Sequence, residues 1–375
     1  MKKKIFFKNL DGLRFLCFLS IFLFHSFHTE FSEIKATSVY QFIKRGVFGN
    51  GNIGVNFFFV LSGFLITYLL IEEKKLNGQI NLKNFWIRRI LRIWPLFYLC
   101  VFIGFIVFPW IKDAMGQISN ETANPIYYLT FLNNFDFIKN GLPDSSILGV
   151  LWSIAIEEQF YLIWPVILYI CPLDKLWLPF GIIIISSLTF RAFNDHYLIH
   201  EYHTLSCIGD MTIGATGAWL ISVSQKFKNK IENLSRFQIA AIYVVFIFIF
   251  FFRDEVMLSN YGMRIFERTI IAFVILLIIL EQTFSTNSLF KMARFKKISK
   301  LGIITYGLYS LHAVCILVIV TLTKKLGINT HLWEIIVVET PLAFCLTIVV
   351  SKISYTYFEG PFLKLKNKFA YITKE

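Results

Sequence analysis

His25 and Arg14 lie in the first apolar stretch of the chain, residues 10–28, which reads LDGLRFLCFLSIFLFHSFH. They are eleven residues apart, almost three helical turns, so on a helix they share one face about 16 Å apart along the axis. An ionisable side chain at the centre of a membrane helix costs at least about 2.5–3.5 kcal/mol and usually faces a cavity or a partner. The spacing therefore indicates a polar path through the helix bundle.

An imidazole at this depth suits two kinds of chemistry. His25 is predicted to act as the general base that deprotonates an acceptor hydroxyl, or as the nucleophile that carries an acyl group. The alternative is a histidine that only packs and hydrogen-bonds between helices. Asp11, three residues before Arg14, is placed to pair with that arginine.

A second candidate site is the arginine cluster of the segment FWIRRILRIWP, which contains Arg88, Arg89 and Arg92. Their three- and four-residue spacing lets all three face one way on a helix. Guanidinium groups grip phosphates with two parallel hydrogen bonds, which predicts a phosphorylated cytoplasmic ligand. The alternative is that these cations only fix the orientation of the next span.

Two adjacent carboxylates, Glu157 and Glu158, lie in the apolar stretch LGVLWSIAIEEQFYLIWP. On a helix they point about 100° apart, so at most one faces a given cavity. We expect Glu157 to orient or charge-balance His25 in the site. The alternative is that these carboxylates pair with arginines elsewhere in the chain, namely Arg191, Arg264 or Arg268.

Two further polar residues lie in apolar stretches. His312 occurs in TYGLYSLH, and Asp210 occurs in CIGDMTIGATGA, whose small residues allow close helix approach. Either side chain would bind substrate or only pack between helices. The stretch GVNFFFVLSGF around Ser62 and Gly63 is interpreted as packing. The six cysteines are scattered singly and no metal-ligand spacing occurs, so no metal site is predicted.

Helices long enough to cross a membrane must position these residues. The 375-residue chain is 56% hydrophobic, and its apolar residues fall into long blocks. We expect an all-α polytopic membrane protein, a bundle of about ten transmembrane helices that forms one domain over 1–375. The expected spans are 10–28, 53–71, 94–111, 147–170, 177–193, 207–223, 237–252, 267–284, 301–322 and 334–355.

The positions of the basic residues predict the orientation of this bundle. The termini and the loops on their side hold 24 of the 37 Lys and Arg residues, and the opposite loops hold 9. Both termini are therefore predicted to be cytoplasmic. Because the basic residues that give the formal charge of +13 lie mostly in short loops, no nucleic-acid partner is expected. The partners expected from this pattern are membrane lipids.

The ordered set of motifs resembles the acyltransferase-3 family of bacterial integral membrane acyltransferases. The matching segments are LDGLRFLCFLSIFLFH, GVNFFFVLSGFLI, FWIRRILRIWPLFY, WSIAIEEQFYLIWP, IGDMTIGATGA, TYGLYSLH and FEGP. The resemblance covers nearly the whole chain. It implies a multi-pass protein of the bacterial cell (inner) membrane that moves an acyl group, usually acetyl, from cytoplasmic acetyl-CoA to a hydroxyl. The acceptor would be a cell-surface polysaccharide or its lipid-linked precursor.

The resemblance also implies roles for individual residues. His25 would be the catalytic base or acyl carrier, with Arg14 as its partner and Glu157 as the acidic site residue. Arg89 and Arg92 would meet the CoA phosphates. Two departures are visible: Cys207 stands where many members have an arginine, and the sequence shows no hydrolase-like domain of the kind some members append. A transporter or flippase of a lipid-linked sugar, with buried ion pairs, is the alternative function.

Overall fold

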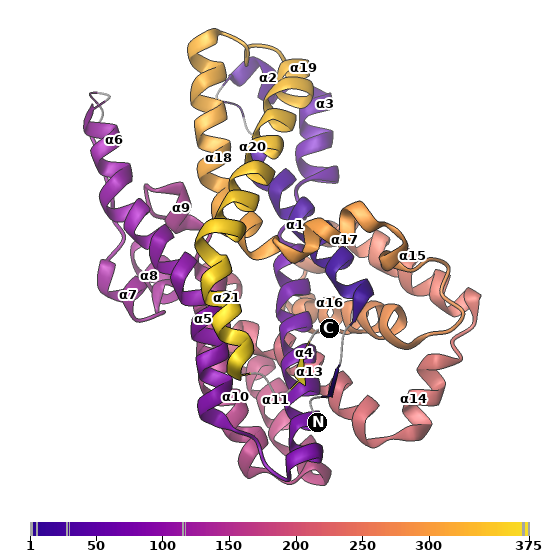
Figure 1. Cartoon of the computed structure of the whole chain (residues 1–375). Helices are drawn as coiled ribbons and strands as arrows, with labels where there is room; N and C mark the ends of the chain where they lie inside the picture. Colours follow the sequence, from indigo (N-terminus) through magenta and orange to yellow (C-terminus); the bar gives the residue numbers. More distant parts are fainter. Residues whose placement is uncertain are drawn as a thin grey trace.

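Helices form almost all of the described structure (Figure 1), as the apolar blocks of the sequence predict. The computed structural model describes residues 3–4, 7–27, 29, 31–114, 116, 118–369 and 372–373. The long helices are α1 (Lys8–Ser26), α4 (Ile53–Asn77), α5 (Leu82–Phe102), α10 (Trp152–Ile170), α11 (Trp177–Phe193), α13 (Thr204–Val223), α15 (Arg236–Arg253), α16 (Tyr261–Phe284), α18 (Thr305–Leu326) and α20 (Thr340–Ile353).

Shorter elements connect or extend these helices. The short α-helices are α2 (Ser32–Ala36), α3 (Ser38–Gln41), α6 (Phe108–Ala114), α7 (Pro125–Leu129), α8 (Asn133–Asn140), α9 (Ser146–Gly149), α12 (Tyr197–Tyr202), α14 (Gln225–Glu232), α17 (Lys296–Ile303), α19 (Leu332–Glu334) and α21 (Gly360–Lys366). The π- and 3₁₀-helical segments are η1 (Phe42–Val47), η2 (Ile103–Val107), η3 (Leu173–Lys175), η4 (Asp254–Leu258), η5 (Met292–Arg294), η6 (Ile335–Glu339), η7 (Ser354–Glu359) and η8 (Asn367–Phe369). Two strands, β1 (Lys3–Lys4) and β2 (Ile372–Thr373), pair in parallel.

Six helical stretches of the described residues are long and apolar enough to cross a membrane. They are Ile53–Asn77, Leu82–Ala114, Trp152–Ile170, Leu173–Phe193, Thr305–Leu326 and Leu332–Phe369. A seventh arises if Gln225–Glu232 and Arg236–Leu258, bent by 86°, form one span. Each of the ten expected spans coincides with a helix, but α1, α13 and α16 are not among these apolar stretches, because α1 and α16 carry several charged residues and α13 is rich in small and polar ones. The chain is thus a helical membrane protein, and its number of spans by this criterion is lower than ten.

Helix α1 lies near the middle of the molecule and joins two hydrophobic cores (Figure 1). Phe18 and Phe22 belong to the larger core, which includes the buried residues of α5, α10 and α18. Leu10 and Leu13 belong to the second core, formed mainly with α4 and α16. A helix that is apolar on most sides and buried in this way can expose a polar side chain only toward an internal space or a partner.

Helices α4 and α13 approach each other closely through glycines. A Cβ on Gly63 would lie 1.8 Å from the carbonyl oxygen of Met211, and one on Gly214 would lie 2.0 Å from that of Val60. No side chain fits at either position, so the small-residue stretches allow the close backbone contact. The packing interpretation of Gly63 and of the span containing Gly214 is confirmed.

The arginine cluster lies in the first half of a long helix, α5. Helix α5 begins after Asn81, whose side chain accepts a hydrogen bond from the Asn84 backbone N–H, and runs through Pro95. It continues through η2 and α6, so the basic segment and the apolar span are one stretch of 33 residues. The strand pairing of Lys3 with Ile372 brings the two ends of the chain together.

Candidate active site

His25 and His312 meet between α1 and α18. His25 Nδ1 lies 3.1 Å from His312 Nε2, and the ring centroids are 5.1 Å apart. His312 Nδ1 in turn lies 2.5 Å from the backbone carbonyl oxygen of Tyr309. The two histidines differ in accessibility: His25 is exposed, whereas His312 is completely buried among the aromatic rings of Phe18 and Phe22.

This hydrogen-bond chain determines which nitrogens carry protons when both rings are neutral. The Tyr309 carbonyl can only accept, so His312 Nδ1–H donates to it. His312 Nε2 is then an acceptor, and His25 must donate to it from Nδ1–H. The remaining nitrogen, His25 Nε2, is left with a free lone pair on the accessible ring. That is the form in which an imidazole acts as a base or a nucleophile.

Among the described residues, no carboxylate is hydrogen-bonded or ion-paired to Arg89 or Arg92; Glu157 and Glu158 lie only within electrostatic range of Arg89, and Glu359 within that of Arg92. Neither forms a hydrogen bond or an ion pair there, and the buried Arg89 Nε has no acceptor. The Arg89 guanidinium instead lies over the Tyr161 ring, 5.5 Å from its centroid. Arg14 lies within electrostatic range of Arg92 and forms a close ion pair with Asp11, as the sequence predicted for that pair. A buried guanidinium N–H without an acceptor fits an anionic ligand such as a phosphate.

Arg88 points to a different part of the molecule. Its Nη1 donates to the Phe369 carbonyl at 2.7 Å, and its Nη2 lies 3.4 Å from Glu73 Oε2. These contacts tie α5 to the C-terminal segment and to α4. The structure therefore separates Arg88 from the other two arginines of the segment.

Glu157 lies on α10 close to this arginine group. It accepts a hydrogen bond from Ser62 Oγ at 2.7 Å, and Ser62 Oγ is also 3.0 Å from the Tyr161 hydroxyl. Arg89 and Arg14 are both within electrostatic range of Glu157. Tyr309 is within electrostatic range of Glu157 too, and the predicted contact of Glu157 with His25 is not among the contacts of the described residues.

Glu158 faces another direction, as adjacent helical positions require. Its Oε2 accepts from Trp94 Nε1 at 2.8 Å. The alternative that Arg191, Arg264 or Arg268 pairs with these glutamates is wrong. Those arginines pair with Glu267, Asp195 and Asp210, respectively, because α16 and the segments around it supply nearer carboxylates.

Asp210 lies apart from the histidine pair in a buried ion network. Its Oδ2 accepts from Arg268 Nη2 at 2.6 Å and from Asn56 Nδ2 at 3.0 Å. Both ions are buried, with Asp210 1% and Arg268 3% exposed. The structure thus gives Asp210 a partner on α16 and another on α4, and its contacts link three helices.

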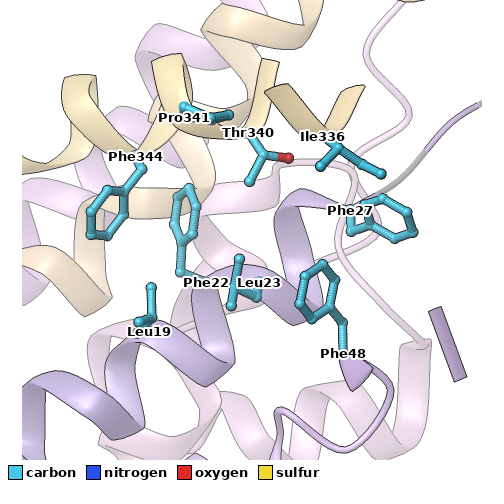
Figure 2. Close-up of a pocket in the computed structure, with 9 residues that line it drawn as sticks. All are labelled: Leu19, Phe22, Leu23, Phe27, Phe48, Ile336, Thr340, Pro341 and Phe344. Carbon is cyan, nitrogen blue, oxygen red and sulfur yellow. The ribbon is translucent and has the colours of Figure 1, made fainter. Parts of the chain in front are cut away.

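An apolar pocket of 290 Å³ lies on another side of α1 (Figure 2). Figure 2 shows Leu19, Phe22 and Leu23 of α1 facing Thr340 and Phe344 of α20 across it. Phe22 also packs against the His312 ring. The lining contains no acid or base, so this pocket supplies no reactive group.

Four residues of this region had no role in the sequence-based site. Tyr161 and Tyr309 each lie on the helix face of a predicted residue, four after Glu157 and three before His312, so helical spacing would have found them. Ser62 was interpreted only as packing, and its hydroxyl meets Glu157. Glu359, in the FEGP segment, is buried within electrostatic range of Arg92.

Comparison with known proteins identifies the class. The acyltransferase-3 family model, which describes an acyltransferase domain, matches residues 7–356. The chain therefore belongs to this family of acyltransferase domains, which confirms the resemblance. No solved structure matches the chain.

Three relatives illustrate the similarity. The chain is 28% identical over 378 residues to the peptidoglycan O-acetyltransferase OatA of Listeria monocytogenes, covering 95% of this chain and 56% of that protein. It is 26% identical over 377 residues to YrhL of Bacillus subtilis, provisionally named a peptidoglycan O-acetyltransferase, with coverages of 94% and 54%. A provisionally named O-acetyltransferase of Staphylococcus aureus is 26% identical over 388 residues, with coverages of 97% and 58%. The chain thus spans about half the length of the curated relatives it matches.

Proposed function

We propose that this chain transfers an acetyl group from acetyl-CoA to a hydroxyl of a cell-wall glycan or its lipid-linked precursor. The observation that carries this proposal is the hydrogen-bond chain from Tyr309 through His312 to His25, which leaves His25 Nε2 free on an accessible ring. Family membership supports acyl transfer over the flippase alternative. The names of the relatives support a glycan acceptor and an acetyl donor.

The arginine pair is the proposed grip for the donor. Neither Arg89 nor Arg92 is hydrogen-bonded or ion-paired to a carboxylate in the described structure, and the buried Arg89 Nε has an unused proton. Phosphate oxygens of CoA would satisfy these donors with charge-assisted hydrogen bonds. Glu157, which accepts a hydrogen bond from Ser62, partly compensates the positive charges of Arg14 and Arg89 and helps to position these side chains.

His25 is the proposed general base. Its Nε2 takes the proton of the acceptor hydroxyl while that oxygen attacks the acyl carbon, and the imidazolium returns a proton to the leaving sulfur. His312 Nε2 accepts from His25 Nδ1–H throughout, so it holds the ring and stabilises the charge that forms on it. Acyl transfer through His25 itself is the alternative, and it predicts an acylated enzyme when acceptor is absent.

We propose that all ten helices expected from the sequence span the bacterial inner membrane with cytoplasmic termini. The pairing of β1 with β2 supports an even number of crossings because both ends then lie on one side. The excess of Lys and Arg on the terminal side supports a cytoplasmic location for it. Under this topology Arg89 and Arg92 face the compartment that contains acyl-CoA.

The test uses the purified chain in lipid vesicles with acetyl-CoA labelled in the acetyl group. Thiol release and label transfer to a cell-wall glycan extract are followed for the wild type, His25→Ala and Arg89→Ala. We expect transfer to vanish in His25→Ala while CoA binding persists, and CoA binding to weaken in Arg89→Ala. A wild type that neither binds nor consumes acetyl-CoA or longer acyl-CoAs would reject the proposal and favour the flippase.

A further inference from the structure

A polar cavity of 510 Å³ lies beside the end of α1 that carries His25. One wall is Phe24, whose ring contacts the His25 ring edge-on with 5.1 Å between centroids. The other walls come from the loop before α4, from α12 with the residues before it, and from the ends of α15 and α16 with η4 between them. Its volume falls within the range of ligand sites in proteins, about 300–1,000 Å³.

Asn50 gives this cavity an unused hydrogen-bonding group. The residue is 3% exposed and lines the cavity, and its side-chain amide has no hydrogen-bond partner in the part of the chain that the structure describes. A carboxamide offers two donors and an acceptor oxygen. Since buried polar groups are normally paired, an unpaired amide that faces a cavity indicates a polar ligand or water there.

The arginines of the cavity are already neutralised. Arg253 Nε donates to Glu267 Oε1 at 2.6 Å, and Arg264 Nη2 donates to Asp195 Oδ2 at 2.6 Å. The hydrogen bond from Arg264 lowers the pKa of Asp195, so that pair is ionised at neutral pH. Burial, together with Arg191, lowers the pKa of His200, so this histidine adds no charge. The lining contains two further carboxylates, Glu201 and Asp254.

This charge balance selects among ligands. A phosphate or carboxylate entering the cavity would find each lining arginine already paired and would meet four carboxylates. An uncharged polyhydroxyl compound meets no such penalty, because its hydroxyls donate to carboxylates and accept from guanidinium and amide N–H groups. Arg89 and Arg92 differ from these arginines, because neither is hydrogen-bonded or ion-paired to a carboxylate among the described residues, and this distinguishes the cavity from the proposed donor end.

We propose that this cavity binds an uncharged sugar unit of the acceptor glycan, adjacent to the unit whose hydroxyl His25 deprotonates. This inference rests on the proposed function and adds the place and chemistry of acceptor binding. Asn50 supplies hydrogen bonds inside the cavity. Tyr197, which also lines the cavity and is 67% exposed, supplies an aromatic ring.

The kinetic test uses the full chain in vesicles, acetyl-CoA and a pentasaccharide of N-acetylglucosamine as the acceptor probe. In Asn50→Ala and Tyr197→Ala we expect the KM for the pentasaccharide to rise about five- to tenfold, the loss typical of one or two neutral hydrogen bonds or contacts. The KM for acetyl-CoA and the acceptor-independent release of CoA stay unchanged. Asn229→Ala, on the exposed surface of α14, is the matched control.

A binding test without turnover uses Tyr197→Cys in a background in which the exposed Cys345 is replaced by serine. The pentasaccharide is expected to slow labelling of this cysteine by a membrane-impermeant maleimide, and CoA is expected not to. Protection by CoA would overturn the inference. So would an active enzyme in which the pentasaccharide does not slow labelling of the cysteine and in which Asn50→Ala and Tyr197→Ala leave the KM for the pentasaccharide unchanged. Saccharide protection in a chain that transfers no acetyl group would reject the proposed function and leave the sugar site standing.

Discussion

Replacement of His312 by leucine removes the acceptor of the His25 Nδ1–H bond without changing the charge of the neutral site. In the structure the bond spans 3.1 Å from His25 Nδ1 to His312 Nε2, and His312 is completely buried. When His25 takes up the substrate proton, this bond becomes charge-assisted. Such bonds contribute about 1.5–3 kcal/mol, which corresponds to a roughly 10- to 150-fold loss of kcat.

The matched variant is His312→Gln. A glutamine side chain places a carboxamide oxygen near the position of His312 Nε2 and can accept from His25 Nδ1–H. We therefore expect His312→Gln to recover part of the kcat lost in His312→Leu. The KM for acetyl-CoA should stay within about twofold in both, because Arg89 and Arg92 lie elsewhere.

The assay is release of CoA thiol and transfer of labelled acetyl, with thermal melting of each variant in parallel. If His312 accepts from His25 Nδ1–H, we expect kcat to decrease from the wild type to His312→Gln to His312→Leu at comparable melting temperatures. If the leucine variant retains wild-type kcat, the hydrogen bond to His312 is not needed to keep the proton of His25 on Nδ1. If both variants lose activity equally and in proportion to their melting temperatures, His312 is a packing residue and the reasoning is refuted.

Three further predictions concern the surrounding structure. Arg89→Ala and Arg92→Ala should each raise the KM for acetyl-CoA about 10- to 150-fold, because each removes a charge-assisted contact with the donor. Arg88→Ala should lower the melting temperature with little change in that KM. A change in KM that is confined to Arg88→Ala would contradict the assignment of Arg89 and Arg92 to the donor site. Gly214→Val should destabilise the protein by about 1–3 kcal/mol or more, seen in thermal melting, because its side chain would meet the α4 backbone. Asp210→Asn should cost about 3–5 kcal/mol of stability, because the buried Arg268 would keep only the more distant carboxylate of Glu201, 3.8 Å away, and an unchanged melting temperature would show that Asp210 is dispensable.

Helix positions were predictable because apolar blocks and helical spacing are local properties of the sequence. The pair of Asp11 with Arg14 follows from a three-residue separation, and the close contact at Gly63 follows from the small residues around it. The number of membrane crossings is harder to predict from the sequence. Residues that carry chemistry make a helix more polar, so α1, which carries His25, falls outside the apolar spans.

Long-range partners were not predictable from spacing. His25 and His312 are separated by 287 positions, and nothing local indicates that they share a hydrogen bond. The same limit explains why the alternative that Arg268 pairs with the glutamates of α10 was wrong, since α13 supplies a nearer carboxylate at Asp210. Asn50 was missed for a further reason: a polar residue in a loop between apolar blocks is ordinary, and only its burial beside a cavity distinguishes it.

The two proposed substrate sites differ in how their arginines are compensated, and this difference is sufficient to assign each substrate to one of them. At the donor end, Arg89 and Arg92 have no hydrogen-bonded acid in the described structure, so a polyphosphate is attracted there and held. In the polar cavity beside Phe24, Arg253 and Arg264 are already paired with carboxylates, so the same polyphosphate gains little and meets like charge. For a neutral glycan, the polar cavity is the favoured site. Each substrate is therefore favoured at only one of the two sites, and the reaction proposed for His25 requires the thioester and the hydroxyl to meet at the histidine pair.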